Sequence, residues 1–204
     1  MSIKKRVIAA CLLVMSVALL FSTHFIESLF NSANYNGRLI NTTAPEFTLI
    51  DLDGQTASLT DFKGQYVYLM FGYLNCTKTC HSQALVLDSL SRQLAHLDNV
   101  QFIYISMDPQ RDSTSKLKSY FSDKKDTLTV LKANDFKHVQ AIANKYNAPF
   151  SYSLANNINQ DDISHPGYLY LINPDGQVSI IYSSNLIDTD ALQADLSTYR
   201  LNFS

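Results

Sequence analysis

The segment "YVYLMFGYLNCTKTCHSQALVLDSLSRQLAHL" (residues 66–97) predicts a buried strand, a corner that carries two cysteines, and a helix. Residues 66–74 are apolar throughout, which is typical of a strand buried on both faces of a sheet. After the cysteines, Leu87, Leu90 and Leu94 recur at helical spacing. Because α/β folds place their sites at the carboxyl ends of strands, this segment indicates both a fold class and the position of a site.

Strand and helix patterns alternate through the rest of the chain. Two turns, at Asp53-Gly54 and at residues 173–176, have the composition of hairpin turns. Further strands are expected at 100–108, 128–133, 167–172 and 177–183, and helices at 113–124, 135–147 and 188–201. This order predicts an α/β fold, a thioredoxin-like mixed sheet flanked by helices, with an extra N-terminal β-hairpin over residues 45–59.

Residues 1–26 predict a membrane anchor or signal segment. Lys4, Lys5 and Arg6 precede an uncharged stretch, residues 7–26, which approaches the roughly 20 residues that a span needs. The basic flank predicts that this end stays in the cytoplasm. No clear small-x-small cleavage site follows the apolar core at the usual place, so an uncleaved anchor is favoured over a cleaved signal peptide. The expected location is the inner (cytoplasmic) membrane, single-pass, with the domain facing the periplasm or extracytoplasmic side.

Composition and charge narrow the function classes. Residues 27–43 are polar and aperiodic and are expected to form a linker, which leaves residues 44–204 as one domain of ordinary size. The formal net charge of −2 provides no basic field, so nucleic-acid binding is not expected. Three cysteines are too few for a disulfide-stapled scaffold.

The cysteine pair at the corner, Cys76 and Cys80, is compatible with a metal site or a redox site. The partial positive charge of a helix N-terminus stabilises a thiolate, and Lys78 acts in the same direction, so one thiol should be unusually acidic. Three residues separate the cysteines, and a disulfide forms readily only if Cys76 lies in the turn before the helix. A metal ion tolerates the wider spacing more easily. Two inert core cysteines would leave this placement unexplained.

A metal site needs a third ligand, and two thiolates with an imidazole select copper or zinc. Among the histidines, His24 lies in the predicted anchor, whereas His96 and His138 lie on helices with polar neighbours and are expected to face solvent. His81 adjoins the second cysteine, but a neighbouring helical position points away from it. In a thioredoxin-like sheet, the loop of His165 passes close to the first helix, so His165 is the histidine that the topology can bring to the cysteines.

Three segments together resemble the Sco/SenC family of copper proteins that serve cytochrome c oxidase assembly. They are "APEFTLIDLDGQTASLTDFKGQYVYLMFGYLNCTKTC" (44–80), "ISMDPQRDS" (105–113) and "SHPGYLYLINPDGQV" (164–178). The resemblance implies that Cys76, Cys80 and His165 are copper ligands, for Cu(I) or Cu(II).

The same resemblance implies a membrane-anchored copper metallochaperone. Its expected partner is the CuA-bearing subunit of cytochrome c oxidase, to which it would deliver copper or whose cysteines it would reduce, or another exported copper or thiol protein. The alternative is a thiol-disulfide oxidoreductase acting on exported proteins, with Cys76 and Cys80 as the catalytic pair. Beyond such exchange no enzymatic activity is expected.

The chain departs from the family pattern near the expected ligands. Lys78 stands where the family usually has an acidic residue, and His81 stands where it usually has proline. Ser164 and Pro166 flank the distal histidine, in place of the usual Asp before it and a small or hydroxyl residue after it. These changes affect the electrostatics around the ligands and bear on copper affinity and delivery target. The Asp-Pro-x-Arg-Asp turn at residues 108–112 is expected to be held by local hydrogen bonds and an Arg–carboxylate pair rather than to be catalytic.

Overall fold

The fold is seen in a computed structural model that describes most of the chain after residue 34. The described residues are 35–75, 80–122, 128–152, 163–183 and 188–203, with residues 80–82 described by their backbone only. The cysteine loop from 76 to 79 and the predicted anchor, residues 7–26, therefore lie outside the described residues. Residues from Tyr35 onward form one compact unit.

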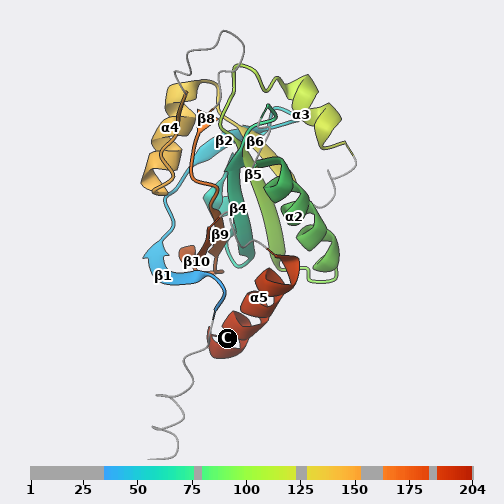
Figure 1. Cartoon of the computed structure of the whole chain (residues 1–204), viewed down its shortest axis with the longest axis vertical. Helices are drawn as coiled ribbons and strands as arrows, with labels where there is room; N and C mark the ends of the chain where they lie inside the picture. The colour runs from blue at the N-terminus through green and yellow to red at the C-terminus, as the bar shows by residue number, and fades with distance from the viewer. Residues whose placement is uncertain (1–34, 76–79, 123–127, 153–162, 184–187, 204) are drawn as a thin grey trace, which may run out of the picture. The chain divides into compact units, whose positions relative to one another are not determined.

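An eight-stranded mixed sheet forms the centre of this unit, in the order β1-β10-β9-β4-β5-β6-β2-β3 (Figure 1). The neighbours β4, β5 and β6 pair in parallel, and the other pairs are antiparallel. The strands of this sheet are β1 (Arg38–Thr43), β2 (Thr48–Asp51), β3 (Thr56–Ser58), β4 (Tyr66–Gly72), β5 (Val100–Ser106), β6 (Thr129–Lys132), β9 (Leu169–Ile172) and β10 (Gln177–Tyr182). The hairpin predicted at residues 45–59 is β2 and β3, and it extends the sheet beside β6.

Helices cover both faces of the sheet, as predicted, with α4 on one face and α2 and α3 on the other (Figure 1). They are α2 (Cys80–Gln93), α3 (Thr114–Tyr120), α4 (Phe136–Lys145) and α5 (Thr189–Phe203), and a 3₁₀ turn covers Leu59–Phe62. Two of these helices begin at side-chain caps, because Ser113 accepts a hydrogen bond from the Lys116 amide and Asp135 accepts one from the His138 amide. The sequence predicted both starts, with the first at Ser113 or Thr114.

Strand β4 is buried at every position because each of its faces supports a separate core. Its alternate side chains Val67, Leu69 and Phe71 pack in the cluster that includes α4. Tyr68 and Met70 point the other way, into the cluster that α2, α3 and α5 complete. The uninterrupted apolar run in the sequence follows from this two-sided burial.

The start of the domain differs from the sequence prediction. Residues 27–43 were expected to be a linker, but residues 38–43 form β1, which pairs antiparallel with β10. The backbone is tied down even earlier, because the Asp195 carboxylate in α5 accepts hydrogen bonds from the amides of Asn36 and Gly37 at 3.0 and 3.1 Å. Gly37 runs so close to β10 that a Cβ there would lie 2.3 Å from a side-chain carbon of Ile180.

A small second sheet was not predicted at all. Strands β7 (Ser151–Tyr152) and β8 (Ile163–Ser164) pair antiparallel just before the segment that carries His165. Among the described helices, none is long and apolar enough to cross a membrane.

Candidate metal centre

The structure describes the three predicted ligands to different degrees. Cys76 lies outside the described residues, and Cys80 is described by its backbone, as the first residue of α2. His165 is fully described, half-buried in the connection between β8 and β9. The described part of the site consists of His165 and the residues that surround it.

Tyr73 links the end of β4 to the His165 segment. It follows the last residue of β4, precedes Cys76 by three positions, and is 3% exposed. Its ring meets the His165 ring edge-on, with centroids 5.9 Å apart and planes at 79°. Its hydroxyl accepts a hydrogen bond from the backbone amide of Ile163 at 3.2 Å. The segment that precedes Cys76 is thus in contact with the segment that carries His165.

Gln83 makes the corresponding link from the first turn of α2. Its side-chain amide nitrogen donates to the backbone carbonyl of Gly167 at 2.7 Å, and the side chain is 6% exposed. Residues three apart on a helix are neighbours on its surface, so this bond also brings the start of the helix at Cys80 to the residues that follow His165. This contact supports the prediction that the His165 segment lies close to the beginning of α2.

The His165 ring is oriented by its own loop. Its Nδ1 lies 3.1 Å from the carbonyl oxygen of Pro166. In a neutral imidazole that donates from Nδ1, the lone pair is on Nε2, which is the tautomer suited to binding a metal. The half-buried position and this hydrogen bond fit a histidine ligand.

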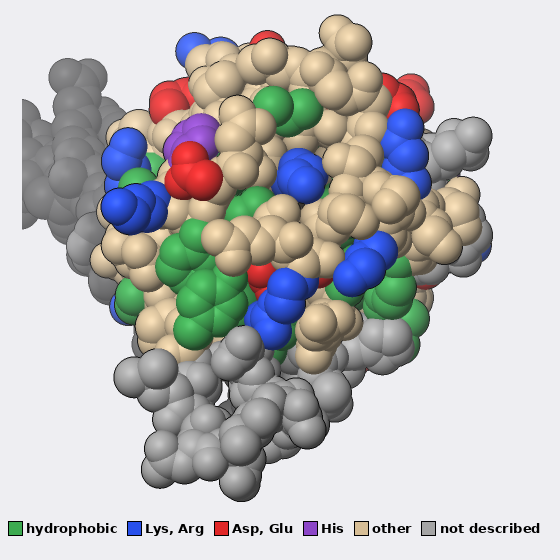
Figure 2. Space-filling view, turned by 90° about the horizontal axis from the view of Figure 1, so that it is seen from above, with side chains coloured by type: hydrophobic (Ala, Val, Ile, Leu, Met, Phe, Trp, Pro, Cys, Tyr) green, Lys and Arg blue, Asp and Glu red, His purple; other side chains and the backbone are tan. Residues whose placement is uncertain are grey.

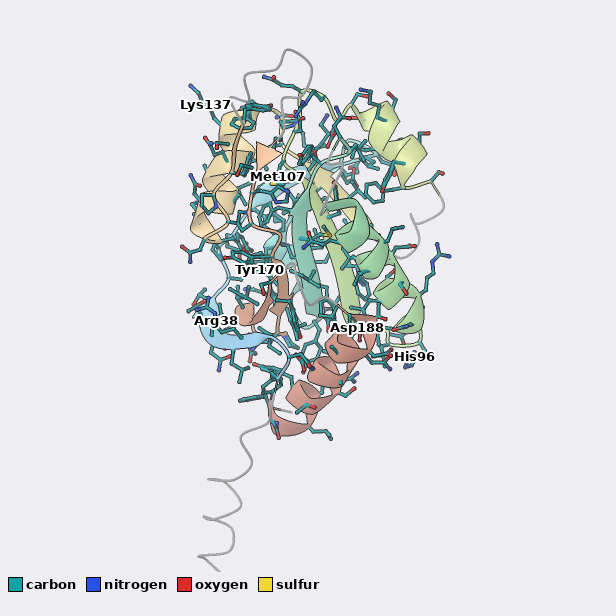
Figure 3. All side chains as sticks on the ribbon, in the orientation of Figure 1. Arg38, His96, Met107, Lys137, Tyr170 and Asp188 are labelled. Carbon is teal, nitrogen blue, oxygen red and sulfur yellow. The ribbon has the colours of Figure 1, made fainter. Side chains whose placement is uncertain are left out.

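The other described histidines face solvent, as predicted, although His96 lies after the end of α2 and not on the helix. His138 is exposed on the first turn of α4, and His96 is exposed beyond the end of α2, at the end of the domain away from α3 and β8 (Figure 3). The side chain of His81 lies outside the described residues. Among the described side chains, which do not include those of Cys76 and Cys80, no group of three or more His, Cys, Asp or Glu is placed to hold a metal ion.

The Asp-Pro-x-Arg-Asp turn is a structural loop beside the site, as predicted. Arg111 forms an ion pair with the fully buried Asp108, and its guanidinium carbon lies 6.0 Å from the centre of the Tyr73 ring. Tyr152 of β7 lies 5.5 Å from the same guanidinium carbon and donates to Asp108 from its hydroxyl at 3.2 Å. The loop therefore braces Tyr73 and β7 together.

Asp112, in the same turn, ties β5 to the residues after β4. It accepts a hydrogen bond from the Ser106 hydroxyl at 2.7 Å and from the Leu74 amide at 3.3 Å. Burial raises the pKa of this carboxyl above its ordinary value, although both hydrogen bonds act against the rise. Lys and Arg side chains lie over this end of the molecule (Figure 2), and Lys132 donates to the backbone carbonyl of Asp112 at 3.2 Å.

Tyr73 and Gln83 are the site residues that the sequence analysis missed. In the sequence, Tyr73 is part of the apolar run 66–74, and Gln83 lies in the expected helix that follows the cysteines. A polar residue one turn into the helix, on the face of the leucines, was the available signal. Gln83 precedes Leu87 and Leu90 by four and seven positions, which is helical spacing toward the core.

Comparison with known proteins identifies the family of this chain. The SCO1/SenC family matches residues 36–200, which is most of the chain. The chain belongs to the SCO1/SenC family. Protein SCO2 from mitochondria of Saccharomyces cerevisiae is 32% identical over 137 residues, which cover 64% of this chain and 44% of the yeast protein. The chain spans only 44% to 60% of the first curated relatives it matches.

Solved structures of the family share the fold. Yeast Sco1 with copper bound has a TM-score of 0.67 and 25% sequence identity, covering 80% of this chain and 90% of that chain. BsSco, described as a member of the Sco family of cytochrome c oxidase assembly proteins, has a TM-score of 0.64 and 23% identity, covering 79% and 95%. The predicted thioredoxin-like sheet with helices on both faces is thus confirmed, and the anchor stays a prediction.

Proposed function

We propose that this SCO1/SenC protein binds one copper ion through Cys76, Cys80 and His165 and serves the assembly of cytochrome c oxidase. The observation that supports this most directly is the placement of His165, which Tyr73 and Gln83 connect to the two chain segments flanking the cysteines. Two thiolates and a neutral imidazole suit both Cu(I) and Cu(II).

Copper in this role is cargo, and the protein's residues determine when it can be held. The thiols must be deprotonated to bind copper, and the helix N-terminus at Cys80 favours the thiolate form. Oxidation of the pair to a disulfide removes two electrons and two protons and leaves no thiolate to bind the metal. The same pair can therefore deliver copper to the CuA-bearing subunit of the oxidase or, as a dithiol, reduce the cysteines of that subunit.

The experiment is a copper titration of the reduced full chain with a histidine variant beside it. His165→Ala should weaken copper binding at least about 10-fold, since losing even a group that only orients a ligand costs 10- to 100-fold in affinity. The bound Cu(II) form should show intense thiolate-to-copper charge-transfer absorption, and prior oxidation to the disulfide should abolish binding.

His138→Ala is the matched control, because His138 is an exposed histidine and should leave affinity unchanged. Equal binding by His165→Ala and wild type would show that the ligand assignment is wrong. A wild-type protein that binds neither form of copper but reduces protein disulfides efficiently would establish the thiol-disulfide oxidoreductase instead.

The proposed location is the inner membrane, with the domain on the periplasmic or extracytoplasmic side. Its basis is the basic flank and the uncharged stretch of residues 7–26. A reporter fused after Ser204 should be active only outside the cytoplasm. A cytoplasmic signal would contradict the topology, and a soluble, shortened mature protein would indicate a cleaved signal peptide.

A further inference from the structure

We propose that Tyr73 and Gln83 form a clamp that positions His165 for copper; the role in copper binding rests on the function proposed above. The clamp comprises three contacts: Tyr73 contacts Ile163 and His165, and Gln83 contacts Gly167. Neither residue is expected to touch the metal, so both are positioning residues.

The Tyr73 contact fixes the segment before His165 and the imidazole itself. The hydroxyl accepts from the amide of Ile163, two positions before the histidine, and the ring edge packs against the imidazole. Tyr73 is in turn held by burial and by the guanidinium of Arg111, which is paired with buried Asp108. A buried ring bounded in this way has little freedom to follow a moving histidine, so it defines where the imidazole can lie.

The Gln83 contact fixes the segment after His165. Its bond to the Gly167 carbonyl is short and buried at 2.7 Å, and Gly167 is two positions after the histidine. Each backbone contact of the clamp is therefore two residues from the imidazole, one on each side. A segment held at both ends has few alternative conformations, and a ligand on it is pre-organised.

The positions of the clamp residues explain why the arrangement serves a three-ligand site. Tyr73 precedes Cys76 by three positions, and Gln83 follows Cys80 by three positions. The residues that flank the cysteines are thus the same residues that hold the histidine segment. Tyr73 and Gln83 each join the His165 segment to the residues on one side of the cysteines. The position of the imidazole is therefore fixed relative to both sides. Without the clamp the cysteines would still form a dithiol, but the third ligand would no longer be pre-organised.

The first test uses the reduced, copper-free full chain and measures amide hydrogen exchange. Tyr73→Phe keeps the ring and removes the hydroxyl, so exchange at the Ile163 amide should accelerate at least about 10-fold, because a hydrogen-bonded amide becomes exposed to local opening. Tyr35→Phe is the control. It removes a hydroxyl at the other end of the domain that is hydrogen-bonded to Asn202, and it should not change exchange at the Ile163 amide. Unchanged exchange at Ile163 in Tyr73→Phe would overturn the clamp, whether or not the protein binds copper.

The second test asks whether Gln83 acts on copper through His165. Gln83→Met has a similar volume and no donor, and it should weaken copper binding roughly 10-fold, the lower end of the loss seen when an orienting partner is removed. Gln93→Met is the control on the same helix, since Gln93 is exposed and bonds only at 3.4 Å to Thr189.

The double variant separates positioning from general destabilisation. In the His165→Ala background, Gln83→Met should cause no further loss of affinity, because the ligand that it positions is already gone. An equal loss in both backgrounds, or no loss in either, would overturn the positioning role. If wild type binds no copper, the proposed function fails, and the exchange of the Ile163 amide still decides the clamp.

Discussion

Asp112 shows how one buried carboxyl shapes the response of the domain to pH. It is 1% exposed, and burial raises the pKa of its carboxyl above the ordinary value of 3.8. The hydrogen bonds from Ser106 and Leu74 favour the charged form, but they only offset part of this effect. The folded state therefore binds the proton of Asp112 more tightly than the unfolded state does.

The sign of the pH dependence follows from this difference. A raised pKa in the folded state adds stability below the unfolded pKa, and that contribution is lost as the pH rises through the folded pKa. We expect the free energy of unfolding of wild type, relative to Asp112→Asn, to decrease from about pH 4 toward neutrality. Urea unfolding of both proteins at a series of pH values measures this difference in the free energy of unfolding. The Asn variant has its own constant offset from altered hydrogen bonding, so only the slope of the difference is diagnostic. A difference that stays flat or increases with pH contradicts the assignment.

At the level of single residues, the sequence was informative wherever chemistry restricts the choice of side chain. Few side chains can bind copper, so composition and topology are enough to predict Cys76, Cys80 and His165 as ligands, and this assignment stays a prediction. Tyr73 and Gln83 could not be predicted in this way, because their roles depend on which backbone groups lie opposite them in the fold. The helical spacing of Gln83 with the leucines indicates a side chain that faces the core, but it does not indicate that the partner is a carbonyl 84 positions away.

At the level of elements, the long and strongly patterned segments were predictable. β4 is apolar at each position because both faces are buried, and α4 begins where Asp135 caps it. The hairpin of β2 and β3 follows from the Asp53-Gly54 turn, with Gly54 at a φ of 84°. In these cases the local sequence and the tertiary structure favour the same conformation.

The strands that escaped prediction are those whose stability comes from a partner. β1 has the sequence RLINTT, is mostly exposed, and has no apolar alternation, with a register shift between Leu39 and Thr42. It is a strand because the edge of β10 offers it hydrogen bonds. β7 and β8 have two residues each, too few for a periodic pattern, and were therefore also missed.

At the level of the whole domain, the candidate site and the beginning of the domain lie at opposite ends of β4. Tyr66, at the start of the strand, packs against Tyr199 of α5, whose ring also contacts Tyr35. Tyr73, just after the end of the strand, packs against His165. A change at the beginning of the domain should therefore alter folding without altering the site directly.

The beginning of the domain gives the final prediction, which concerns residues 35–40. Asp195 is 2% exposed and accepts hydrogen bonds from the Asn36 amide, the Asn36 side chain and the Gly37 amide. A fragment starting at residue 41 loses these donors and half of β1, whereas one starting at residue 35 retains both. Because a buried carboxylate without donors is costly, we expect the fragment 41–204 to be less stable than 35–204 by at least about 3 kcal/mol in urea unfolding.

Asp195→Ala distinguishes this cause from a general effect of shortening the chain. In the fragment 35–204 the substitution should destabilise the fold, because it removes the acceptor of three donors. In the fragment 41–204 it should cost little or increase stability, since it removes a buried charge that has lost its partners. Equal losses in both fragments would show that Asp195 does not fasten the start of the domain. Equal stability of the unsubstituted fragments would show that the domain begins at residue 41 or later, close to the boundary near residue 44 that the sequence predicted.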